Sequence, residues 1–114
     1  MSETPRLKSS IRVSAHLRRA EAGGAFAVIS KKGDADAGAV IVKIYLGRSE
    51  IGETIAQAHY ESVLDTGERG WRMAFDAPRE EQAIDQWIAR EIEMDPDLWV
   101  IEIDDPQGRA FLEM

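Results

Sequence analysis

Residues 79–112 constrain the fold of this chain more than any other stretch, because they combine a helix pattern, a marked stop and an apolar strand. The helix pattern consists of apolar residues at steps of three and four, which share one helical face: Ile84, Trp87, Ile88 and Ile92. Asp76 and Pro78 suit the start of this helix as a capping acceptor and a first-turn proline. Pro96 excludes Asp95 from the α region, so we expect the helix to end there.

The strand that follows, residues 98–103, has one wholly apolar face and a second face that is half apolar. Successive side chains of a strand point to opposite faces, so Trp99, Ile101 and Ile103 share one face. Such a strand is expected inside a sheet rather than at its edge. Residues 105–108 predict a hairpin turn, because Pro106 presets one turn residue and Gly108 can adopt a positive φ. Residues 109–112 are then expected to return as a strand.

The chain before residue 79 predicts one helix and four strands. The helix begins at Ser9 or Ser10, either of which can cap it, and ends near Ala22 before two glycines. Strands are expected at residues 25–31, 39–46, 54–64 and 71–75.

Two parts of this interpretation leave alternatives open. Residues 11–17 also fit the strand period of two, although the alanines that follow favour a helix. Residues 54–64 fit either a helical stripe or strand alternation, and the turn-like residues 65–70 after them favour a strand. Residues 32–38, with two glycines and two aspartates, predict a hairpin loop between the first two strands.

These elements predict an α+β domain with a largely antiparallel sheet of about five to six strands. The expected order is an N-terminal helix, a four-stranded meander, a second helix and a C-terminal hairpin, with the helices packed on one face of the sheet. A length of 114 residues suits one domain, so we expect residues 1–114 to form it, with residues 1–8 as a frayed tail.

Composition bounds the class of protein. The chain has no apolar run of the about 18 residues that a transmembrane helix needs, and its N-terminus lacks the apolar core of a signal peptide. It has no cysteine, which excludes disulfides and thiolate metal sites. We therefore expect a cytoplasmic protein that does not associate with membranes.

Two segments resemble a family of small, uncharacterised alphaproteobacterial proteins, a domain of unknown function. They are residues 32–40 (KGDADAGAV) and residues 95–103 (DPDLWVIEI), and the basic residues 17–20 (LRRA) and Trp87 fit the same pattern. The resemblance covers nearly the whole chain, and its motifs are structural rather than chemical. It implies no activity, ligand or catalytic residue.

The residues whose side chains could act in catalysis or bind a metal form no known catalytic or metal-binding pattern. Asp34, Asp36 and Gly38 look like the opening of a calcium loop, but the glycine stands where a third oxygen ligand is needed. His16 and His59 are the only histidines, and no zinc-ligand spacing surrounds them. We expect no metal and no cofactor.

The net charge of −7 conceals an asymmetry, because the first 32 residues are mainly basic and the remainder is acidic. Glu102 lies within the predicted strand, and if buried it would need a cationic partner such as Arg72, Arg90 or Arg109. The three tryptophans are expected mainly in the core.

Three hypotheses on function follow. The first is a non-enzymatic binding or protein-interaction module that forms a homodimer through an uncovered sheet face containing Ile41, Tyr45 and Trp71. The second is a small ligand-binding domain or enzyme with a pocket between sheet and helices, near these residues: Arg48, His59, Tyr60, Arg72 and Glu102. The third is a nucleic-acid binder that uses basic residues of the N-terminal region: Arg12, Arg18, Arg19, Lys31 and Lys32. Because the acidic body opposes a phosphate backbone, a protein partner is expected over nucleic acid.

Overall fold

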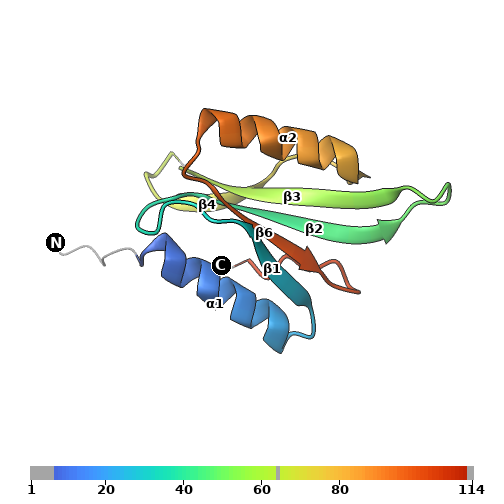
Figure 1. Ribbon diagram of the computed structural model, residues 1–114, viewed down its shortest axis with the longest axis horizontal. Helices are drawn as coiled ribbons and strands as arrows, with labels where there is room; N and C mark the ends of the chain where they lie inside the picture. Colours follow the sequence, from blue (N-terminus) through green and yellow to red (C-terminus); the bar gives the residue numbers. More distant parts are fainter. Residues whose placement is uncertain (1–6, 64, 113–114) are drawn as a thin grey trace.

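The computed structural model describes residues 7–63 and 65–112. Helices and strands follow in this order (Figure 1): α1 (Ser9–Ala22), β1 (Phe26–Lys31), β2 (Val40–Arg48), β3 (Thr54–Val63), β4 (Arg69–Met73), β5 (Arg79–Glu80), α2 (Glu81–Met94) and β6 (Trp99–Asp104). The α+β class is confirmed, and residues 54–63 form the strand that we preferred to a helix. Leu7 and Lys8 of the predicted tail precede α1. Residues 1–6, and Leu64 at the end of the predicted third strand, lie outside the described residues.

The described strands all belong to one sheet in the order β1-β6-β2-β3-β4, and β5 pairs with β3 beside this path. β6, the last strand in the chain, lies between β1 and β2 and runs parallel to β2. The predicted meander is therefore wrong at its first step, because β1 and β2 are not neighbours. The physical reason is that β6 is wholly apolar on one face and half apolar on the other, so it gains most from an interior position. The other pairings are antiparallel, which confirms a largely antiparallel sheet.

The predicted C-terminal hairpin is also wrong. Gly108 has the positive φ of 69° that the turn requires, but residues 109–112 form no strand. They return toward α1, where the carbonyl oxygen of Ala110 lies 2.8 Å from Nε2 of His16. β1 and β2 already flank β6, so a returning strand has no free edge of β6 to pair with. The segment packs on the hydrophobic cluster under α1 instead.

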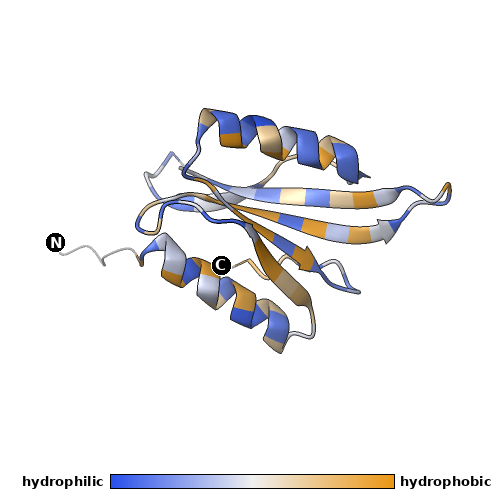
Figure 2. Ribbon diagram, viewed as in Figure 1, coloured by the Kyte–Doolittle hydropathy of each residue, from blue (hydrophilic) through white to orange (hydrophobic). Residues whose placement is uncertain are grey.

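The helices lie on opposite faces of the sheet (Figure 1), although we expected both on one face. On β2, Val42 packs in the cluster that contains α1, whereas its neighbour Ile41 packs in the cluster that contains α2. Neighbouring side chains of a strand point to opposite faces, so the two helices must do the same. The cause is that the central strands have apolar side chains in both clusters, and therefore on both faces, which need cover on each side. Figure 2 shows the apolar residues along these strands.

Candidate functional site

The loop between β1 and β2 crosses directly over the segment that leads from α2 into β6. A Cβ atom at either Gly33 or Gly38 would overlap the carbonyl oxygen of Asp97. The amide of Asp34 donates to that same oxygen at 2.9 Å, and the indole Nε1 of Trp99 donates to the carbonyl of Asp34 at 2.7 Å. Only glycine permits this close crossing. The loop therefore crosses over the start of β6 and holds it in place, and it is not the predicted hairpin loop.

The first turn of α1 is fastened to this loop. The hydroxyl of Ser9 donates to the carbonyl of Gly38 at 2.6 Å, and the Ser10 amide donates to the carbonyl of Ala35 at 3.0 Å. The free amides of the helix start are thus satisfied by loop carbonyls. Because these carbonyls occupy the position where an anion would bind, the geometry does not support a phosphate site at the helix start.

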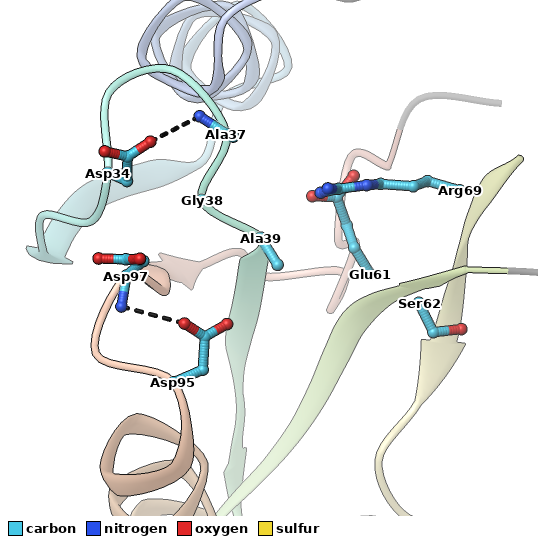
Figure 3. A pocket seen from close by; sticks show the side chains of 9 residues that line it. All are labelled: Asp34, Ala37, Gly38, Ala39, Glu61, Ser62, Arg69, Asp95 and Asp97. Atoms are coloured by element: carbon cyan, nitrogen blue, oxygen red, sulfur yellow. Dashed lines mark hydrogen bonds between the residues drawn. The ribbon is translucent and has the colours of Figure 1, made fainter.

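A shallow cavity of about 400 Å³ opens beside the crossing (Figure 3). Asp34, Asp95 and Asp97 line one side of it, and Glu61, Ser62 and Arg69 line the other. Two of the carboxylates already hold turns. Asp34 Oδ2 accepts from the amide of Ala37 at 2.8 Å, and Asp95 Oδ1 accepts from the amide of Asp97 at 3.1 Å. Across residues 7–63 and 65–112, no group of three or more histidines and carboxylates is arranged to hold a metal ion.

Arg12, a candidate for nucleic-acid contact, is instead part of a buried ion pair. Its guanidinium bonds to Oε2 of Glu61 on β3, and both side chains are largely buried. Glu61 Oε1 also accepts from the amide of Val40 at 3.1 Å. The pair therefore ties α1 to the start of β2, and Arg12 is not available to a phosphate backbone.

The main buried polar network centres on Lys43 of β2, whose side chain is 4% exposed. Its Nζ lies 2.7 Å from Glu81 and 2.6 Å from Asp85, both on α2. Glu102 of β6 lies 3.6 Å from the same nitrogen and accepts from the hydroxyl of Tyr45 at 2.7 Å. The partner of Glu102 is thus Lys43, not one of the three arginines that we considered.

The electrostatics of this network keep Lys43 protonated. Burial acts to lower the pKa of Lys43, but hydrogen bonds to Asp85 and Glu81 outweigh it, and the pKa lies above its ordinary value. The pKa of Tyr45 is raised by burial and by its carboxylate neighbours, and that of Glu81 is lowered chiefly by its bond to Lys43. A lysine held as a cation is a poor nucleophile or base, so the network fits a structural clamp between α2 and the sheet.

The other predicted site residues are dispersed, and each has a local role. Arg48 donates to the carbonyl of Gly52, and Arg72 donates to the hydroxyl of Ser62. Arg19 donates to the carbonyl of Phe111, while Arg18 is exposed on α1.

Tyr60 and His59 are neighbours on β3 and point to opposite faces of the sheet. Tyr60 packs on Trp87, with ring centroids 5.7 Å apart. Burial lowers the pKa of His59. The predicted ligand-site residues thus do not converge on one pocket.

The exposed large apolar side chains of the described strands are Phe26 and Val28 of β1, Leu46 of β2 and Met73 of β4, not the residues expected from the sequence. Ile41 is 1% exposed, and Trp71 packs against the cluster under α1. Phe26 and Val28, by contrast, are 70% and 42% exposed. Both point to the face that α2 covers further along the sheet, since Val28 pairs with Glu102 and Glu102 joins the network under α2. The sequence indicated a strand at residues 25–31, but it did not indicate that this strand lies at the edge of the sheet.

A hollow of about 440 Å³ adjoins the same strand. It is lined by residues from the end of α1 to the middle of β1: Glu21, Gly24, Ala25, Phe26, Ala27 and Val28. Among the described strands, β1 pairs only with β6, so its outer edge borders this hollow without a strand partner. We call the outer edge of β1, the hollow, and the side chains of Phe26 and Val28 the β1 edge surface.

The fold and these sites define a class: a small α+β domain whose mixed sheet has one helix on each face and whose described polar clusters serve structure. The family described as "Protein of unknown function (DUF1491)" matches residues 7–113, and the chain belongs to this family. The resemblance to an uncharacterised alphaproteobacterial family is thereby confirmed. No curated protein matches the chain.

Solved structures of relatives support the same assignment. Two solved structures, one by crystallography and one by NMR, each show a DUF1491 family protein from Caulobacter crescentus whose sequence is 41% identical to this chain, and each has a TM-score of 0.79. The crystal structure alignment covers 94% of this chain and 95% of the relative, and the NMR structure alignment covers 96% and 94%. A solution structure from A. tumefaciens is 32% identical over 95% of this chain and 93% of the relative, with a TM-score of 0.74. Within the described residues, no helix is long and apolar enough to cross a membrane.

Proposed function

We propose that this protein is a non-enzymatic protein-interaction module that binds an extended segment by strand addition at the β1 edge surface. The observation that carries the proposal is the exposure of Phe26 on a strand that pairs on one side only. An added strand gains main-chain hydrogen bonds from the edge, and the alternate side chains beside it provide specificity. The adjoining hollow leaves room for the added backbone.

The opposite edge of the sheet does not offer the same surface. β4 exposes one apolar side chain, Met73, but it also carries Arg69 and Arg72, and β5 pairs with β3 near it. Charged side chains and interruptions are the usual means by which proteins protect an edge from pairing. β1 has only Lys31 at its end, and Lys31 is occupied by the carbonyls of Pro96 and Leu98.

The test is a selection of short random peptides on the immobilised protein, followed by amide-shift mapping of the selected peptides. We expect peptides that perturb β1 and lose at least about tenfold in affinity for Val28→Lys, because a lysine beside the edge opposes strand addition. Ile51→Lys is the matched control, since Ile51 is 80% exposed and lies in the β2–β3 connection. Selected peptides that map elsewhere, or that bind Val28→Lys unchanged, would overturn the proposal.

A further inference from the structure

We propose that the partner at the β1 edge surface is a second copy of the chain, paired antiparallel through β1 with Ala27 on the two-fold axis. This inference rests on the proposed function, because it names the occupant of the same edge. It also assigns a register, which makes it testable residue by residue.

The register follows from symmetry and side-chain size. A two-fold axis perpendicular to the sheet places residues of the same face opposite one another. With Ala27 on the axis, Phe26 of one copy lies opposite Val28 of the other, so the exposed apolar side chains cover each other. With Val28 on the axis, Phe26 would instead face Ser30, beyond the irregularity in pairing that follows Ile29. A small residue on the axis also lets the two copies of α1, which lie on that face, approach.

Charge supports the same antiparallel pairing. The end of β1 in one copy, which Lys32 follows, lies beside the start of β1 in the other copy, which follows Glu21 and the end of α1, where the helix dipole is negative. Lys32 and Glu21 are both exposed, and Glu21 lines the hollow. By symmetry the contact occurs twice.

The interface is small, so the expected association is weak. A short strand pair with two apolar side chains from each copy buries less than the roughly 1,200 Å² typical of stable complexes. We expect a monomer–dimer equilibrium that becomes visible in sedimentation equilibrium at high micromolar concentration.

A single cysteine on the proposed axis tests the register directly, because the natural chain has no cysteine. Ala27→Cys should form a disulfide-linked dimer under mild oxidation, since residues opposite each other on paired strands have Cβ atoms about 5 Å apart. Ile51→Cys is the control for random collision. Ala27→Cys dimers that form no faster than Ile51→Cys dimers, at concentrations where the chain sediments as a dimer, would overturn the register.

A charge exchange tests the contact without cysteine. Lys32→Glu and Glu21→Lys should each weaken association about tenfold, because each puts like charges together at two symmetric positions. The double variant should recover most of the affinity. A chain that stays monomeric at high micromolar concentration refutes self-pairing alone, provided selected peptides still bind β1. If the chain stays monomeric and no selected peptide binds β1 either, the proposed function is refuted as well.

Discussion

The Nζ atom of Lys43 lies 2.6 Å from Oδ1 of Asp85, so a buried residue of the central strand β2 is bonded directly to helix α2. Glu81 and Glu102 share the same cation. One lysine thus fixes α2 over the sheet, on the face opposite α1.

Removal of this cation should be costly. Lys43→Met leaves carboxylates close together without a counter-charge, and we expect a loss of about 2 kcal/mol in unfolding free energy, less than for a fully buried pair because Asp85 is half exposed. Urea unfolding measures it, with exposed Lys32→Met as the control. Addition of Glu81→Gln and Glu102→Gln to Lys43→Met should restore part of the loss. Wild-type stability in Lys43→Met alone would contradict the clamp.

Stability should fall in acid. Hydrogen bonds to Lys43 hold the pKa of Glu81 below its usual 4.5, and bonds from Arg109 lower that of Asp105 from 3.8 to about 2. Lowered folded-state pKa values stabilise the protein above the unfolded values, and this stability is lost as pH falls through the folded values. We expect unfolding free energy to decline from about pH 4.5 toward pH 2. Arg109→Leu should flatten the lower part of this decline, whereas the exposed Arg90→Leu should not.

The glycine crossing is expected to tolerate no side chain. Gly38→Ala would press a methyl group into the carbonyl oxygen of Asp97, a backbone atom that cannot rotate away. We expect a loss of about 3 kcal/mol or failure to fold, as is typical of severe overpacking. Ala35→Ser, an exposed change in the same loop, is the control in thermal unfolding. A Gly38→Ala protein within experimental error of wild type would contradict the crossing.

The contribution of the hydrogen bond between Trp99 and Asp34 to stability can be tested with a conservative substitution. Trp99→Phe keeps an aromatic ring in the core but removes the indole N–H that donates to the carbonyl of Asp34. We expect a loss of about 1–3 kcal/mol, because the carbonyl loses a buried donor. Trp87→Phe, on a half-buried ring of α2, is the comparison. Equal losses from the two changes would show that ring size matters rather than the hydrogen bond.

Local patterns predicted the elements well because their signals are local. The three- and four-residue steps of Ile84, Trp87 and Ile88 define α2, and the apolar and half-apolar faces of β6 correctly indicated an interior strand. Strand order was not predictable in this way. Gly33 and Gly38 suit a hairpin loop as well as a crossover, and only the insertion of β6 between β1 and β2 decides between them.

The candidate site shows the same limit. Lys43 lies on the strand face of Ile41 and Tyr45, which we expected to be uncovered, and its partners Glu81 and Asp85 come from a helix far along the chain. Ile41 was expected at an uncovered face, but α2 buries it, and the exposed residue is Phe26 because β1 lies at the sheet edge. Burial at these positions depends on which strands are central, and side-chain periodicity does not report that.

Amide hydrogen exchange at two protein concentrations tests the interaction surface most directly. If the β1 edge binds a second copy, amides of residues 24–32 exchange more slowly at high micromolar than at low micromolar concentration, while amides of the β2–β3 connection are unchanged. Val28→Lys should abolish the difference. Equal exchange rates of residues 24–32 at both concentrations, in a sample that sediments partly as a dimer, would contradict the β1 edge as the interface.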